Sequence, residues 1–311
     1  MKKVLVTGAT GFVGRHLVEL LTTLDIEIYA VVRNEEKAKS FLGQLKNVHI
    51  VCCPLNFYAH MSEKISTRDI DVAYHFAWEG SAGPNRADTW MQLQNAQHNV
   101  EFLRAMKEIG CKRVVCAGTI MEHEVIAACY KDGNRPGPGY IYGSGKLVAH
   151  TMCMSVAAQI GLDLIWAEIT NAYGAGEKSA RMVNTTIRKI IRGETPQFTA
   201  GTQNYDFVYI DDAVMAFYLI GQKGKPFHNY LIGSGQARPL KEFLLEMQAS
   251  IAADLPFVFG DVPYTGTDIP IEKFSCQKAT DELGYVPQVS FAEGVKKTMN
   301  WLMENKDDNE V

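Results

Sequence analysis

The sequence predicts an α/β protein built on a doubly wound parallel sheet, with a smaller α/β lobe beside it. Two observations predict this fold. First, short runs rich in Val, Ile and aromatic residues alternate with helix-patterned segments through the first half of the 311-residue chain. Such alternation is typical of a parallel sheet covered by helices on both faces. Second, the first of these runs leads directly into the glycine-rich turn GATGFVG and then into a helix pattern.

Composition narrows the class of protein. Hydrophobic residues make up 47% of the chain and charged residues 21%, an ordinary globular balance. The formal net charge of −4 gives no basic footprint for nucleic acid or an anionic membrane. The apolar run near the N-terminus is too short for a signal peptide, and no stretch approaches the ~20 apolar residues of a membrane span. Seven cysteines without a CxxC pair indicate reduced thiols, so we expect a cytoplasmic protein.

The expected elements follow from hydrophobic periodicity. The predicted strands of the first half are residues 3–7, 27–32, 48–53, 72–76, 113–117 and 162–169. The second half is more mixed, and its predicted helices are residues 181–192, 211–222, 239–252, 277–283 and 292–304. The last six residues, 306–311, are expected to be frayed.

Two helical segments of the first half are unusually apolar. Residues 85–109 carry one apolar stripe at helical spacing, formed by Trp90, Leu93, Ala96, Val100, Leu103 and Met106. Residues 147–160 are apolar nearly all round, so that helix needs cover on two sides. We therefore expect a homodimer that forms through helices 85–109 and 146–160.

The turn after the first strand predicts a dinucleotide site. Gly8, Gly11 and Gly14 lie at a strand–turn–helix junction. Missing side chains there let backbone amides approach a pyrophosphate at the helix N-terminus. Three glycines alone are weak evidence, but their place after the first strand of the chain strengthens it.

The end of the second predicted strand bears on the choice of cofactor. An acidic residue at this position accepts a hydrogen bond from the ribose 2′-hydroxyl of NAD. This sequence has Arg33 there, and a guanidinium pairs well with the 2′-phosphate of NADP. Arg15, just after the third glycine, is a second candidate for that phosphate. We expect NADP, with NAD as the alternative.

The segment GYIYGSGKL at residues 139–147 has two interpretations. As a phosphate-binding P-loop it fails, because Tyr140 stands where a glycine is required and Leu147 where Ser or Thr is required. Alternatively, Tyr142 and Lys146 lie one helical turn apart on the same face. A nearby ammonium stabilises a phenolate and adapts it to acid–base chemistry. Thr119, just after the strand at 113–117, can reach the same space above the sheet.

Several motifs together extend this interpretation. They are TGATGFVG at 7–14, HFA at 75–77, Thr119, YGSGK at 142–146, NAYGAG at 171–176, DFVYIDD at 206–212 and LIGSG at 231–235. With these motifs the chain resembles, over essentially its whole length, an extended short-chain dehydrogenase/reductase of the NAD-dependent epimerase/dehydratase family. Members of that family have a Rossmann dinucleotide-binding domain, and most act on nucleoside-diphosphate sugars.

The resemblance implies roles for individual residues. Tyr142 is the expected acid/base, Lys146 holds the nicotinamide ribose and lowers the tyrosine pKa, Thr119 hydrogen-bonds the reacting sugar oxygen, and Asn171 lies near the substrate diphosphate. The expected cofactor-binding residues are Gly8, Thr10, Gly11, Phe12, Val13, Arg15, Arg33, Leu55, Phe76, Ala77 and Lys146. The expected substrate-binding residues are Trp78, Glu79, Asn171 and Tyr205.

The same resemblance suggests a division into two units. Residues 1–169 plus 206–233 are expected to form the dinucleotide-binding domain. Residues 170–205 plus 234–311 are expected to form the substrate-binding lobe. No shift in composition marks this boundary.

Departures from the family pattern restrict the expected chemistry. Ile120 and Met121 follow Thr119 where the sugar dehydratases have an Asp-Glu pair, and neither side chain can transfer protons. Dehydration is therefore not expected. Tyr205 and Glu168 stand where the family has arginines that contact the substrate phosphates, which leaves the nucleotide and its pose open. Residues 122–124, Glu-His-Glu, match no standard metal spacing, so no metal is expected.

The expected reaction is hydride transfer at C4 of a nucleotide-linked hexose by an NADPH-dependent 4-keto reductase. A 4-epimerase is the close alternative, because it uses the same residues. Reduction of a non-sugar ketone is a further alternative, against which the motifs at 171–176 and 206–212 weigh. A non-catalytic dinucleotide sensor on the same fold is a more distant one. The combination of Thr119, Tyr142 and Lys146 argues against a sensor, which has no need of a proton-transfer group.

Overall fold

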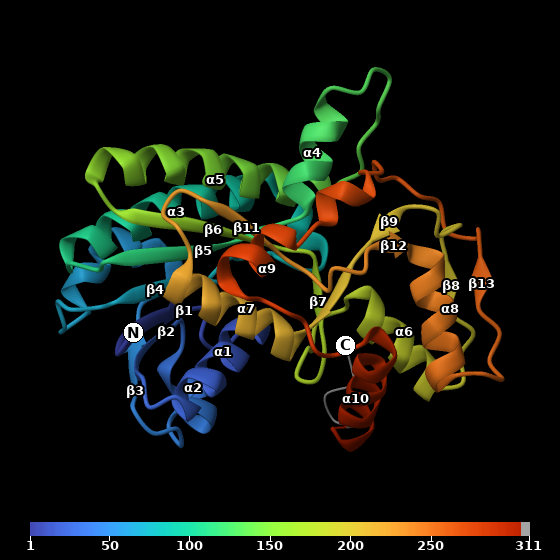
Figure 1. Cartoon of the computed structure of the whole chain (residues 1–311), viewed down its shortest axis with the longest axis horizontal. Coiled ribbons are helices and arrows are strands. Elements are labelled where there is room, and N and C mark those ends of the chain that lie inside the picture. The colour runs from blue at the N-terminus through green and yellow to red at the C-terminus, as the bar shows by residue number, and fades with distance from the viewer. Residues whose placement is uncertain (306–311) are drawn as a thin grey trace.

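The computed structural model describes residues 1–305, and the segment 306–311, expected to be frayed, lies outside the described residues. Its centre is a seven-stranded parallel sheet in the order β11-β6-β5-β4-β1-β2-β3 (Figure 1). The strands are β1 Lys3–Thr7, β2 Glu27–Val32, β3 Val48–Cys52, β4 Val72–His75, β5 Arg113–Thr119, β6 Asp163–Ile169 and β11 Asn229–Ile232. The predicted doubly wound parallel sheet is thus confirmed.

The strand ends differ from the prediction in ways that affect the site. β4 stops one residue early, at His75, so Phe76 begins the following loop. β5 continues two residues further than predicted, because Gly118 and Thr119 still pair with β6. Thr119 is consequently the last residue of a strand, held by the sheet.

Helices cover both faces of the sheet. α1 Phe12–Thr23, α2 Glu35–Leu42 and α7 Ile210–Lys223 lie on one face, and α3 Thr89–Glu108 and α5 Tyr140–Ile160 lie on the other (Figure 1). The 3₁₀ segment η1 Leu55–Glu63 packs into the same core as α3 and α5. The alternation of side chains along β1 explains the two layers: Val4 and Val6 enter one core with the helices α1 and α7, and Leu5 enters the other with α3 and α5. Every residue of β1 after Lys3 is buried.

The chain reverses direction across the sheet at β1. From β1 it winds outward through β2 to β3, then returns to β4 on the other side of β1 and winds outward to β5 and β6. Thr7 and His75 are partners at the ends of β1 and β4. A crevice at the carboxyl ends of the strands is expected at this reversal, since the connecting segments diverge there.

The structure corrects the predicted helix at 85–109. A short 3₁₀ turn, η2 Pro84–Ala87, comes first, and α3 begins after Asp88, whose side chain accepts a hydrogen bond from Met91 N. Trp90 is 69% exposed and Leu93 54% exposed, so the predicted buried stripe is wrong over the first two turns. Ala96, Leu103 and Met106 are buried as predicted.

Polar side chains take the inward positions in those turns. Gln92, Asn95 and Asn99 are buried, and each makes hydrogen bonds there: Gln92 and Asn95 to the loop after β4, and Asn99 to the Asn95 carbonyl within α3. Gln92 Oε1 accepts from Trp78 Nε1 at 2.7 Å, and Asn95 bonds both the backbone N–H and C=O of Glu79. These bonds fix the loop that follows β4.

α5 begins earlier than the predicted helix at 147–160. It starts at Tyr140 and ends at Ile160, and the following residue, Gly161, caps it with a left-handed φ of 64°. The GSGK segment is therefore part of the helix, and Tyr142 and Lys146 lie in its first two turns. α3 and α5 pack side by side on the sheet (Figure 1).

The smaller lobe consists of helices and two-stranded sheets at one end of the molecule (Figure 1). Its helices are α6 Met182–Ile191, α8 Leu240–Ile251 and α10 Phe291–Glu304, close to the predicted ranges. β7 Asn171–Tyr173 pairs with β10 Phe207–Tyr209, β9 Asn204–Tyr205 with β12 Arg238–Pro239, and β8 Gln197–Phe198 with β13 Val258–Phe259. The 3₁₀ turn η3 Ile271–Phe274 precedes α9 Gln277–Leu283, which packs on α7 and β11 of the main sheet.

Within residues 1–305, none of the helices combines the length and the apolar character that crossing a bilayer requires.

Candidate active site

A cavity of about 590 Å³ lies at the carboxyl ends of the parallel strands. It extends from the turn between β1 and α1 to the ends of β5 and the start of α5. Most of the predicted cofactor-binding residues line it: Gly8, Thr10, Gly11, Phe12, Val13, Arg33, Leu55, Phe76, Ala77 and Lys146. Arg15 does not line this cavity.

The glycine turn at one end of this cavity depends on close backbone packing. Gly8 has a φ of +65°, a left-handed conformation that side chains disfavour, and a Cβ there would meet Ala77 N at 2.9 Å. A Cβ on Gly14 would lie 2.2 Å from the Gly8 carbonyl oxygen. α1 starts at Phe12 without a side-chain cap, so amides of its first turn are free to bind an anion. These features fit a dinucleotide pyrophosphate.

The two arginines proposed for the ribose phosphate have different surroundings. The Arg33 side chain is 76% exposed at the edge of the cavity, with its guanidinium 3.8 Å from the carboxylate of Glu79. The Arg15 guanidinium lies 4.0 Å from the ring centroid of Phe41 and also pairs with Glu19. Arg33 alone of the two faces the cavity.

A second cavity of about 290 Å³ adjoins the first on the side of the smaller lobe. Thr119, Tyr142 and Arg181 line both cavities, and Asn171 and Tyr205 line only the second. Trp78 and Glu79, predicted as substrate-binding, line only the first. Tyr142 and Thr119 therefore lie where the two cavities meet.

Tyr142 is a buried phenol close to several charged groups. Its side chain is 8% exposed, and burial is the largest influence on its pKa, which is raised above the ordinary value. The guanidinium groups of Arg181 and Arg86 act in the opposite direction, as does the Thr119 hydroxyl. The Tyr142 ring also meets Trp78 edge-on, with the ring centroids 6.1 Å apart.

Lys146 is one turn further along the same helix and is 5% exposed. Its Nζ donates to the carbonyl oxygen of Ala117 at 2.8 Å and lies 3.8 Å from the ring centroid of Trp78. Burial lowers the lysine pKa to about 8. The ammonium is thus fixed between β5 and the loop after β4, on the wall of the first cavity.

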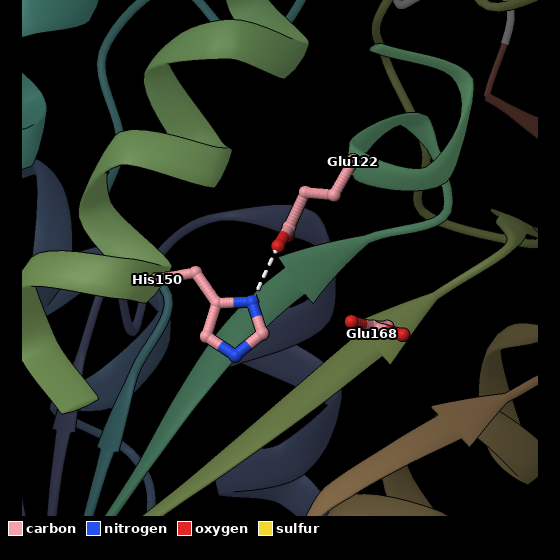
Figure 2. Close-up of side chains that lie close together, drawn as sticks. All are labelled: Glu122, His150 and Glu168. Atoms are coloured by element: carbon pink, nitrogen blue, oxygen red, sulfur yellow. Dashed lines mark hydrogen bonds and ion pairs between the residues drawn. The ribbon is translucent and has the colours of Figure 1, made fainter. Parts of the chain in front are cut away.

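Buried polar groups hold Thr119 in place from behind. The Thr119 backbone N–H donates to Glu122 Oε1 at 2.9 Å, and Trp166 Nε1 donates to the same oxygen. Figure 2 shows Glu122 reaching from α4 Met121–Cys129 toward His150 of α5, whose Nδ1 is 2.7 Å from the other carboxylate oxygen. The second nitrogen of His150 lies 3.2 Å from Asn229 Oδ1.

Glu168, the third residue in Figure 2, lies on β6 beside this pair. Ligand atoms of Glu122, His150 and Glu168 all lie within 4.8 Å of one another. Each of the three side chains nevertheless hydrogen-bonds a protein partner, and for Glu168 that partner is His123 Nε2, 3.0 Å away. Glu168 is thus directed at His123 and lines neither cavity.

Sequence reasoning missed three residues of the second cavity: Arg86, Arg181 and Glu124. Glu124 lies one helical turn after Met121 on α4, and burial raises its carboxyl pKa to about 7. Its spacing from Met121 was a usable signal, since residues three apart share a helix face. Arg86 lies in the short turn η2, and Arg181 lies at the start of α6. At neither position does hydrophobic periodicity distinguish a cavity residue from an exposed one.

Comparison with known proteins identifies the family. The sequence profile of the NAD dependent epimerase/dehydratase family matches residues 4–233. The chain belongs to this family. The chain is therefore an enzyme of the extended short-chain dehydrogenase/reductase type.

Relatives of the chain align with it over nearly its whole length. The dTDP-glucose 4,6-dehydratase of Haemophilus influenzae is 23% identical over 340 residues, covering 98% of this chain and 99% of the relative. The crystal structure of UDP-glucose 4-epimerase of Thermotoga maritima with UDP-glucose has a TM-score of 0.80 and 22% identity, covering 98% and 99% of the two chains. WbmF of Bordetella bronchiseptica in complex with NAD+ has a TM-score of 0.79 and 21% identity, covering 99% and 94%. At these identities the structural likeness establishes the fold.

Proposed function

We propose that this enzyme transfers hydride at C4 of a nucleoside-diphosphate sugar, as an NADPH-dependent 4-keto reductase. The observation that carries the proposal is the position of Thr119 and Tyr142, which line both the larger and the smaller cavity. A dinucleotide in the first cavity and a sugar in the second would meet at these two side chains.

The residues of the first cavity would hold the cofactor. The uncapped amides of the first turn of α1 would bind the pyrophosphate, while the Gly11 N–H donates to the Gly8 carbonyl oxygen and holds the turn. Lys146 would bind the nicotinamide ribose and Arg33 the 2′-phosphate. When bound, the nicotinamide supplies the hydride. Position 33, at the end of β2, offers a guanidinium and no carboxylate, which favours NADPH; the NAD named in the WbmF complex keeps NADH as the alternative.

The protein side chains would manage the proton. In reduction, the Tyr142 hydroxyl donates its proton to the sugar oxygen as the C4 carbonyl becomes an alkoxide. The Thr119 hydroxyl hydrogen-bonds the same oxygen, and the backbone bond to Glu122 keeps Thr119 in position. In the reverse direction the Tyr142 phenolate takes the proton back.

A 4-epimerase is the second candidate, supported by the structural likeness to the Thermotoga maritima UDP-glucose 4-epimerase. It would use the same Thr119 and Tyr142, but it would retain its cofactor and return the hydride to the opposite face of the sugar. The side chains of the site serve both reactions equally.

One experiment separates the two candidates. Purified enzyme is mixed with NADPH or NADH and a panel of 4-keto-6-deoxy and 4-hydroxy sugar nucleotides, and the nicotinamide absorbance and the sugar product are followed. Net oxidation of NADPH supports the reductase. Inversion at C4 without net oxidation supports the epimerase and overturns the reductase. Turnover of neither sugar class, by an enzyme that binds the dinucleotide, would overturn both.

We also propose that the protein acts in the cytoplasm as a homodimer that pairs through α3 and α5. Trp90 and Leu93 of α3 and Met152 of α5 are exposed apolar side chains on those helices, which supports this surface. The division into residues 1–169 plus 206–233 and residues 170–205 plus 234–311 likewise stays a proposal. Sedimentation of Trp90→Glu against the unmodified protein tests the dimer, since a charge in place of this exposed apolar side chain should leave monomers.

A further inference from the structure

Arg86 is an arginine in the second cavity that lacks a carboxylate partner. It lies in η2, on the loop between β4 and α3, and its side chain is partly buried against the cavity wall. Its Nη1 donates to the Ser81 carbonyl at 3.3 Å, and its Nη2 contacts Met121 Sδ. Among residues 1–305 no carboxylate forms an ion pair with it. Burial disfavours the charge of this guanidinium and lowers its pKa, whereas Tyr142 and, at longer range, Glu124 favour the charged form.

The Arg86 guanidinium lies over the aromatic ring of Tyr142. Its central carbon is 4.4 Å from the ring centroid, well within the range of a cation–π contact. The ring face attracts a cation already when the phenol is neutral. The attraction grows when the phenol loses its proton, because the negative charge of the phenolate spreads into the ring.

Lys146 is oriented differently toward Tyr142. Although the two residues are one turn apart, Lys146 Nζ is committed to the Ala117 carbonyl and to the face of Trp78. The cation that directly contacts the Tyr142 ring is therefore supplied by the loop before α3.

We propose that Arg86 is a positioning residue that stabilises the phenolate form of Tyr142 and holds its ring in place during proton transfer. The proposal rests on the proposed function, in which Tyr142 exchanges a proton with the substrate. It adds to that function a residue at a position for which the sequence motifs gave no signal.

The charges around Tyr142 agree with this assignment. Arg181, at the start of α6, and Arg86 lower the tyrosine pKa, while Glu122 of α4 and burial raise it. Lys146 lies on the same helix as Tyr142. Because an arginine stays protonated at every working pH, its effect on Tyr142 does not itself titrate. Removing Arg86 should then move the Tyr142 titration to higher pH.

A direct test observes the tyrosine without substrate. The enzyme is labelled with ¹³Cζ-tyrosine, and the Tyr142 resonance is assigned by its absence from the Tyr142→Phe variant. We expect Arg86→Gln to raise the midpoint of that resonance by about 0.5–1.5 pH units, from the usual strength of a cation–π contact. Arg86→Lys keeps the charge but replaces the planar guanidinium with a compact ammonium, so an intermediate shift is expected.

Arg238 offers a matched control. Its guanidinium carbon lies 4.1 Å over the ring of Phe243 in the smaller lobe, and it lines neither cavity. Arg238→Gln should therefore leave the Tyr142 resonance unchanged. Thermal unfolding of each variant shows that it is folded, and Arg86→Lys supplies the measurement should Arg86→Gln fail to fold.

The outcomes separate this proposal from the proposed function. An unchanged Tyr142 midpoint in both Arg86 variants overturns the role of Arg86, whatever reaction the enzyme catalyses. A shifted midpoint in a protein that turns over no sugar nucleotide supports the contact and overturns only the function. In an active enzyme, the pH inflection of kcat assigned to Tyr142 should move upward by the same amount in Arg86→Gln.

Discussion

The two adjoining cavities are built by different means. The first is shaped mainly by backbone: glycines at 8, 11 and 14, the free amides of α1, and strand ends that the sheet aligns. The second is shaped by side chains from a loop turn, α4, α6 and the small β7–β10 and β9–β12 sheets. Few amino acids fit a site that is shaped by closely packed backbone, whereas a site that is lined by side chains can be built from different residues at different positions. Family membership therefore constrains the first cavity closely, and the residues particular to this chain lie in the second.

The largest effect is expected from a substitution at the boundary between the two cavities. Tyr142→Phe removes the hydroxyl that transfers the proton and leaves the ring packed against Trp78 and under Arg86. We expect kcat to fall about 10²–10⁴-fold, the usual contribution of a positioned acid or base. Dinucleotide affinity, measured by fluorescence titration, should change little. A variant that keeps full turnover would remove Tyr142 from the mechanism.

The backbone-built cavity is tested by adding one methyl group. In Gly14→Ala the new Cβ would lie 2.2 Å from the Gly8 carbonyl oxygen, so the turn between β1 and α1 must shift. We expect a loss of about 1–3 kcal/mol in the free energy of unfolding, measured in denaturant, and weaker dinucleotide binding. Gly139→Ala is the control, because a Cβ there meets nothing within 4 Å. Equal effects of both changes would show that the turn is not closely packed.

Sequence reasoning succeeded where the backbone decides the structure. The parallel strands of the first half, the glycine turn after the first strand, and the position of Tyr142 and Lys146 on one helix were predicted from periodicity and spacing. It failed at α3, where hydrophobicity predicted Trp90 and Leu93 inside. The inward positions there are taken by Gln92 and Asn95, because the loop after β4 leaves backbone groups that only polar side chains can satisfy.

The residues of the second cavity were also hard to predict, because contacts between distant segments place them there. The resemblance predicts phosphate-contacting arginines at positions 205 and 168, where this chain has Tyr205 and Glu168, so the sequence alone left the substrate phosphates without expected partners. The structure places Arg86 and Arg181 at the same cavity from unrelated positions in the chain. No local pattern predicts that these two arginines share a cavity, since they come together only when separate segments of the chain fold against each other.

Cofactor choice is a smaller effect, because it depends on an exposed side chain. Arg33 is 76% exposed, and solvent screens its interaction with a phosphate. We expect Arg33→Ala to weaken NADPH binding about tenfold, within the usual worth of one charge-assisted hydrogen bond, and to leave NADH binding nearly unchanged. Isothermal titration with both cofactors measures this. Equal losses for NADPH and NADH would mean that Arg33 does not contact the 2′-phosphate.

The smallest expected effect concerns Glu124, a carboxyl of the second cavity whose pKa is raised to about 7 by burial, with Asp268 adding to and Arg86 opposing the shift. In the unfolded chain a glutamate titrates near its ordinary pKa of about 4.3. Between that value and about 7 the folded state holds a proton that the unfolded state has released, so the free energy of unfolding falls as pH rises through this window.

For a side chain that is only partly buried, solvent screening reduces this loss to about 1 kcal/mol. Glu124→Gln cannot ionise, and its free energy of unfolding should lack this decline when denaturation is compared at about pH 5 and about pH 8. Glu108→Gln, at an exposed position near the end of α3, should retain the wild-type dependence. An unaltered decline in Glu124→Gln would show that the second cavity leaves Glu124 as well solvated as a surface carboxylate. Burial in the second cavity would then not disfavour the charged form of Glu124.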